Sequence, residues 1–174
     1  SQRITNISNE QLENELPFME VLEKCTEFIT RVCEPFGRDI RRSLVTQGGK
    51  DFDIPMLVHE LVRNGQDAKL YLRRWRVSTL VDMLPFCRNP ALLDNTKLMR
   101  NEYCRPIFKL GDVYAMLVGK PLVGAHGALQ DALGVCEILQ HSELLRKAVL
   151  DDIRFLIHNN IVNLEKFIAG IVAE

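Results

Sequence analysis

The stretch RSLVTQGGKDFDIPML occupies residues 42–57 and combines a strand, a turn and the start of a helix. Its β-type run ends at Thr46, and two consecutive glycines then break the strand. A helix is predicted from about Ile54 to Arg63, because apolar residues recur there at helical spacing. The segment therefore places Asp53 at the turn between a strand and a helix.

An aspartate at such a turn has two interpretations. Its carboxylate can point from the sheet edge towards a shared site, and negative charge near a helix N-terminus is favoured by about 0.3–1 kcal/mol. It can equally be the N-cap of the helix, since Asp is among the best capping residues. The spacing leaves both interpretations of Asp53 open.

A second constellation, GAHGALQDALGVCEIL, occupies residues 124–139. His126 lies between glycines, and Asp131 follows inside the first turns of a helix predicted over 125–140. This pair suits a divalent cation held by the carboxylate, with the imidazole taking a proton from a metal-bound water. A capped helix with an exposed histidine is the alternative.

The remaining pattern predicts an α/β layered domain. Helices are expected at 17–36, 110–117, 142–158 and 161–173, a strand at 77–84 that runs into a short helix, and a loop at 85–108. Two short strands cannot cover this many helices. Either strands on the sheet side are missing from this chain, or the chain contains strands that this pattern does not reveal.

The overall composition excludes few classes of protein. The net charge is −1, so a nucleic-acid partner has to be argued from local patches rather than from total charge. No apolar run is long enough to cross a bilayer, which predicts no membrane partner. The five cysteines are odd in number and lack C-x-x-C spacing, so a reducing, intracellular location is predicted.

Two segments carry a resemblance to a known family. HGALQDA at 126–132 resembles the third motif of the DEDDh-type 3′–5′ exonucleases, where His-x-Ala-x-x-Asp-Ala opens the last core helix. GKDFDIPML at 49–57 resembles their second motif, where a Phe-Asp pair precedes an apolar helix. The segments before and between these motifs, beginning with Ile4–Ile7, are similar in the same order. The resemblance covers about residues 4–140.

The resemblance implies a ribonuclease H-like fold, with an exonuclease-like domain at 1–140 and a helical extension at 141–174 packed on it. It further implies two Mg²⁺ or Mn²⁺ ions about 3.5–4 Å apart. Asp53 and Asp131 would be metal ligands, and His126 would be the general base. The implied substrate is the 3′ end of a single-stranded nucleic acid, and the motifs do not distinguish DNA from RNA.

The sequence departs from the family at its first motif. That motif, an Asp-x-Glu on the first strand, supplies two of four carboxylates and has no counterpart here, and the first three strands are missing with it. Two carboxylates cannot neutralise two divalent cations, so residues 1–174 alone are predicted to be inactive. A separate N-terminal segment or partner chain that completes the sheet is one expectation, and a larger enzyme of which these residues are a part is another. A catalytically inactive module that binds nucleic acid or protein is the alternative.

Basic residues near these motifs suggest a nucleic-acid contact. The candidates are Lys50, Arg73, Arg74, Trp75 and Arg76. Arginines and lysines can hold a phosphate backbone while an aromatic ring stacks on a base. A solvated basic face with no such function is the competing interpretation.

Overall fold

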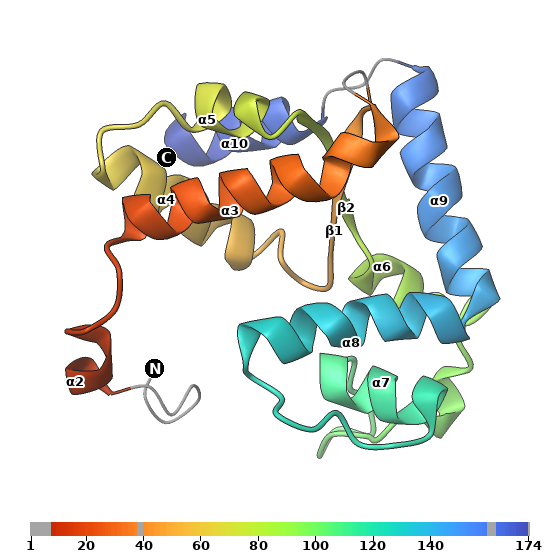
Figure 1. The fold of residues 1–174 in the computed structure, drawn as a ribbon. Helices are drawn as coiled ribbons and strands as arrows, with labels where there is room; N and C mark the ends of the chain where they lie inside the picture. Colours follow the sequence, from red (N-terminus) through yellow and green to blue (C-terminus); the bar gives the residue numbers. More distant parts are fainter. Residues whose placement is uncertain (1–7, 38–39, 160–162, 174) are drawn as a thin grey trace.

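Two parallel strands lie at the centre of the molecule (Figure 1). The computed structural model describes residues 8–37, 40–159 and 163–173. Strand β1 spans Arg42–Thr46 and β2 spans Val77–Asp82, and their register pairs Leu44 with Leu80. Both strands were predicted from the sequence, although β2 ends two residues before the predicted boundary.

Four helices precede β2 in the described part of the chain. They are α2 (Asn9–Leu12), α3 (Phe18–Cys33), α4 (Asp53–Arg63) and α5 (Ala68–Arg74), with a 3-10 turn at Glu34–Phe36. The sequence analysis did not predict α5. Its start is marked by Asp67, whose carboxylate accepts the N–H of Leu70 at 3.0 Å.

The helices that follow β2 account for most of the second half of the chain. They are α6 (Leu84–Cys87), a 3-10 turn at Asn95–Lys97, α7 (Leu110–Val118), α8 (Ala128–His141), α9 (Glu143–His158) and α10 (Asn163–Ala173). The predicted loop at 85–108 therefore contains the end of one short helix and a 3-10 turn.

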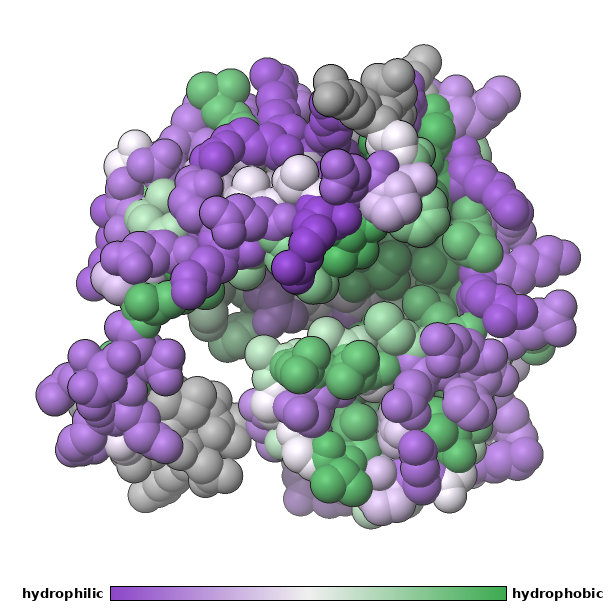
Figure 2. Space-filling view, viewed as in Figure 1, coloured by the Kyte–Doolittle hydropathy of each residue, from purple (hydrophilic) through white to green (hydrophobic). Residues whose placement is uncertain are grey.

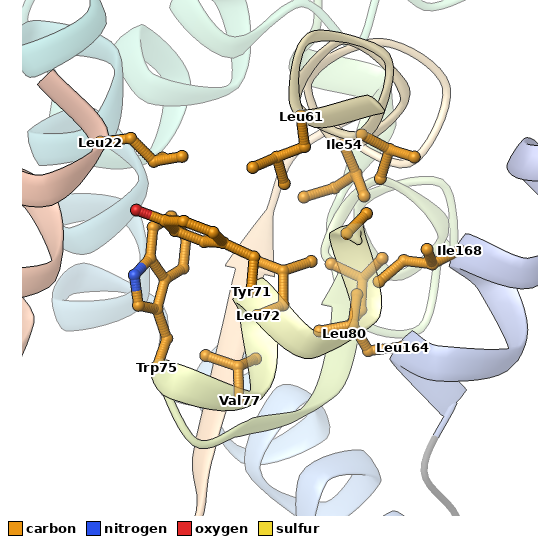
Figure 3. Packing of buried hydrophobic residues seen from close by; sticks show 12 residues of the cluster. Leu22, Ile54, Leu61, Tyr71, Leu72, Trp75, Val77, Leu80, Leu164 and Ile168 are labelled. Carbon is orange, nitrogen blue, oxygen red and sulfur yellow. The ribbon is translucent and has the colours of Figure 1, made fainter. Parts of the chain in front are cut away.

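Leu80 and Val81 are consecutive in β2 and belong to two different hydrophobic clusters, because successive side chains of a strand point to opposite faces of the sheet. Leu80 packs in the cluster that α3, α4, α5 and α10 contribute to (Figure 3). Val81 packs in a second cluster built largely from α6, α7, α8 and α9. Helices thus cover both faces of the small sheet, which confirms the predicted α/β class.

The last two helices contribute buried side chains to both clusters. Leu164 and Ile168 of α10 join the first cluster, and Leu145 of α9 joins the second. Asn163, the first residue of α10, binds the backbone of β2 through its side-chain amide. Its Oδ1 accepts the N–H of Leu80 and its Nδ2 donates to the carbonyl of Leu80, both at 2.8 Å.

Some predictions fall on parts of the chain that the structure does not cover. The Ile4–Ile7 segment of the family resemblance lies outside the described residues, as do the first two residues of the helix predicted at 161–173. Within the described ranges, no helix combines the length and the hydrophobicity needed to cross a membrane.

Candidate functional site

The turn between β1 and α4 positions Asp53. Phe52 occupies the N-cap of α4 and Asp53 is the first helical residue, so the interpretation of Asp53 as the N-cap is wrong. A Cβ atom at Gly49 would lie 2.9 Å from Asp53 Oδ2, which means that the carboxylate rests in the space left by the missing side chain. The Asp53 side chain is exposed and forms no hydrogen bond or ion pair with any residue that the structure describes.

His126 and Asp131 lie at the start of α8, where the local backbone departs from the prediction. The helix begins at Ala128, three residues after the predicted start, because Gly124 and His126 adopt left-handed φ values of 75° and 72°. Asp131 Oδ1 accepts the backbone N–H of His126 at 3.2 Å. The imidazole of His126 is exposed. The carboxylate of Asp131 therefore ties the turn that carries His126 to the helix.

Asp53 and Asp131 line one cleft of about 410 Å³. Its walls come from the end of β1, the start of α4, the start of α7 and the first turns of α8. The lining residues are Val45, Thr46, Gln47, Asp53, Leu110, Ala128, Asp131, Ala132 and Val135. In Figure 2 the surface is hollowed between the side that carries α3 and the side that carries α8. The structure thus brings together two of the three predicted catalytic residues, with the backbone of the third bonded to one of them.

Two further oxygen atoms in this region lack partners. Thr46 Oγ1 and Gln47 Oε1 are buried and form no hydrogen bond in the described structure, whereas Gln47 Nε2 donates to the carbonyl of Phe108 at 3.0 Å. Both residues line the cleft beside the two carboxylates. The sequence analysis missed them. Their position at the carboxyl end of β1 is the available signal, because ligands in α/β proteins bind at the carboxyl ends of strands.

The donor set of the cleft suits a hard cation but is incomplete. Carboxylate, hydroxyl and amide oxygens are the ligands that Mg²⁺ and Mn²⁺ prefer. However, no group of three or more His, Cys, Asp or Glu side chains converges within the described ranges. Asp53 and Asp131 are the two acidic residues among those that line the cleft. Two ions would need further carboxylates from outside the described residues.

In the basic segment 73–76 the three arginines are exposed, but two of them are paired with carboxylates. The guanidinium groups of Arg73 and Arg74 form bidentate pairs with Glu165 and Glu23, with N–O distances of 2.7–3.0 Å. Hydrogen bonding to Arg74 lowers the pKa of Glu23, and hydrogen bonding to Arg73 lowers the pKa of Glu165. These two arginines thus join α5 to α3 and α10.

Trp75 is part of the core and offers no ring face for a base. It is 7% exposed, packs beside Tyr71 (Figure 3) and donates its indole N–H to the Thr26 hydroxyl at 2.7 Å. The prediction that Trp75 stacks on a base is therefore wrong for this structure. Arg76 is exposed, with a left-handed φ of 54°.

Lys50 lies in the turn between β1 and α4, close in sequence to Asp53 but outside the residues that line the cleft. Its backbone N–H donates to Asp82 Oδ2 at 3.3 Å, and the residue is half-buried. Nothing in this geometry assigns its ammonium group to a phosphate.

Comparison with known proteins adds no family to this description. No protein-family model matches the sequence, and a search of curated proteins gave no significant match. Function therefore has to be argued from the motifs and from the geometry of the cleft.

Proposed function

We propose that this chain is part of a DEDDh-type 3′–5′ exonuclease with a ribonuclease H-like fold, in which the cleft at the end of β1 is the site of phosphodiester hydrolysis. The observation that carries the proposal is the convergence of Asp53 and Asp131. The two motifs lie in distant parts of the sequence, yet their carboxylates line the same 410 Å³ cleft. Two further residues that line the cleft, Thr46 and Gln47, each carry a buried oxygen without a hydrogen-bond partner in the described structure.

Each residue has a defined role in this proposal. Mg²⁺ or Mn²⁺, when bound, would supply charge neutralisation for the phosphate oxygens. Asp53 and Asp131 would hold the cation, and Asp131 also keeps His126 beside the cleft through the backbone hydrogen bond. His126 would accept the proton of the attacking water, since imidazole is the commonest general base. The bond to the 3′ oxygen of the penultimate nucleotide would break and release a nucleoside monophosphate.

Metal binding tests the proposal most directly. We expect Mn²⁺ to bind the chain, and Asp53→Asn or Asp131→Asn to weaken that binding by at least about tenfold, because each removes one of two anionic ligands. Asp51→Asn is the matched control, since Asp51 lies in the same turn but does not line the cleft. Electron paramagnetic resonance of free Mn²⁺ measures the affinities. Equal affinities for all three variants would refute the assignment of the two ligands.

Hydrolysis gives a second test with a different expectation. The described residues offer too few carboxylates for two ions, so we expect residues 1–174 to release no mononucleotides from a 3′-labelled oligonucleotide with Mg²⁺ or Mn²⁺. Release that Asp131→Ala abolishes would show that our account of the ligands is incomplete. It would also place the remaining ligands within this chain.

The scarcity of acidic ligands also favours a second candidate function. A catalytically inactive module of the same fold could use the cleft to bind nucleic acid or protein without hydrolysis. Such a module would bind a single-stranded oligonucleotide equally well with and without EDTA. The exonuclease proposal predicts instead that chelation weakens binding of the 3′ end.

A further inference from the structure

The last residue of β2, Asp82, is a buried carboxylate at the base of the cleft turn. It is only 9% exposed. Asp82 Oδ1 accepts the N–H groups of Gly48 and Leu84 at 2.8 and 2.9 Å, and Oδ2 accepts the N–H of Lys50 at 3.3 Å. Hydrogen bonds to an ionised acceptor are stronger than those between neutral groups. One side chain of β2 therefore holds two main-chain amides of the turn that follows β1.

The turn has little freedom to adopt another shape. Gly48 has a left-handed φ of 76°, and a Cβ atom at Gly49 would lie 2.7 Å from the Cβ of Thr46. The carbonyl of Gly49 accepts the N–H of Ile54 at 2.9 Å, which joins the turn to the first residues of α4. These contacts form a continuous path from Asp82 through residues 48–50 to the start of the helix that carries Asp53.

The position of the Asp53 carboxylate depends on this turn. Asp53 Oδ2 lies against Gly49, and no hydrogen bond to a described residue fixes the carboxylate independently. If residues 48–50 moved, the surface that supports the carboxylate would move with them.

The negative charge of Asp82 also affects Cys87. Burial raises the pKa of the Cys87 thiol, and the charge of Asp82 raises it further, to about 11.

We propose that Asp82 is a positioning residue of the cleft, which holds residues 48–50 in the shape that directs the Asp53 carboxylate towards Asp131. The proposal rests on the proposed function in one respect, namely that Asp53 acts as a cation ligand. It assigns Asp82 no contact with the cation or with the substrate, since Asp82 does not line the cleft.

The test compares Asp82→Asn with Asp94→Asn in the full chain. Asp94 is the control because it also accepts a backbone N–H, that of Thr96 at 3.2 Å, and does not line the cleft. We expect Asp82→Asn to increase amide hydrogen exchange at residues 48–54 by about tenfold or more and to shift the Asp53 carboxyl carbon resonance. Exchange in α8 and α10 should stay unchanged. The Mn²⁺ affinity should fall by about 10–100-fold, as is typical when a group supporting a metal ligand is lost.

A second variant acts on the same path while leaving Asp82 intact. Gly49→Ala places a methyl group where Asp53 Oδ2 and Thr46 now lie, so it should shift the Asp53 resonance and weaken Mn²⁺ binding even if Asp82→Asn does not fold. An unchanged Asp53 resonance in Gly49→Ala, or unchanged exchange at 48–54 in a folded Asp82→Asn, would overturn the proposal. A wild-type chain that binds no Mn²⁺ would count against the proposed function alone, because exchange and the Asp53 resonance report the positioning without metal.

Discussion

The segment 73–76 and the cleft at the end of β1 both carry charged residues, but these residues differ in whether they have partners within the described structure. Arg73 and Arg74 form bidentate pairs with two glutamates, and Trp75 lies in the core. In the cleft, Asp53 has no partner in the described structure and Asp131 has one backbone N–H.

The difference shows that a cluster of charged residues in the sequence does not by itself indicate a binding site. A charged side chain that is already paired within the protein has a structural role, whereas an unpaired one is available to a ligand. A paired arginine links two helices and gains little from a phosphate, because the phosphate has to compete with a carboxylate that is already bound. An unpaired carboxylate in a concave site has no such competitor. Substitutions in the two regions should therefore differ in what they do to stability and to binding.

Replacement of Trp75 should have the largest effect. Trp75→Ala is expected to lower the free energy of unfolding by about 3–5 kcal/mol, because it leaves a cavity and removes the indole bond to Thr26. Trp75→Phe should cost less, about 1–2 kcal/mol, since most of the packing remains. Urea unfolding followed by circular dichroism measures both losses of stability. Tryptophan fluorescence cannot be used, because Trp75 is the only tryptophan and both variants lack it. A loss below about 1 kcal/mol for Trp75→Ala would mean that the ring is available to a ligand after all.

The two cleft carboxylates should differ in their importance for stability. Both lie in the first turn of a helix and share the interaction with the helix dipole, so a comparison of Asp131→Ala with Asp53→Ala isolates the bond to His126. We expect Asp131→Ala to be less stable than Asp53→Ala by about 0.5–1 kcal/mol. Chemical denaturation of both variants in parallel gives the difference. The reverse order would reveal a structural partner of Asp53.

Replacement of the two paired arginines should have the smallest effect on stability, and the effect should be seen mainly at acidic pH. The pKa values of Glu23 and Glu165 are lowered in the folded chain, so their contribution to stability is present above the ordinary value of 4.5 and disappears as the pH falls through the lowered value. The double variant Arg73→Ala, Arg74→Ala should therefore lose less stability than the wild type on acidification below about pH 5. Melting temperatures between pH 3 and 7 would show this.

The same double variant also tests whether the two arginines contact nucleic acid. If the arginines contact phosphates, their removal should flatten the salt dependence of single-stranded DNA binding, because fewer counterions are released. An unchanged slope agrees with their structural role. The structural interpretation of these arginines would be wrong if two results were found together. The melting temperatures of the wild type and the double variant would depend on pH in the same way, and the salt dependence of DNA binding would be flatter in the variant.

Much of the fold could be predicted because its signals are local. Ser8 and Gln11, three residues apart, form a capping box in which each backbone N–H is bonded to the side chain of the other residue. The strand β1 and the helix α4 also follow from residue type and spacing. By contrast, the seven-residue helix α5 is too short to show a clear period. The start of α8 was misplaced because the left-handed backbone at His126 is unusual for a residue with a side chain.

The candidate site was predicted only where a motif carried it. The order of the two motifs led to the expectation that Asp53 and Asp131 meet, and they line one cleft. The burial of Trp75 could not be predicted, because its hydrogen-bond partner Thr26 is 49 residues away on α3. The role of Asp82 was missed for the same reason, since its bonds to Gly48 and Lys50 span more than 30 residues.

The amide of Asn163 has a consequence for how the molecule meets other chains. It forms hydrogen bonds with both the N–H and the C=O of Leu80 on β2, as a neighbouring strand would. These two groups are therefore not open to pairing with a strand of another chain. A chain with alanine at this position would expose a bare N–H and C=O that can recruit a second copy. A single side chain at the start of α10 thus satisfies two backbone groups on the side of β2 that no strand of the described sheet covers.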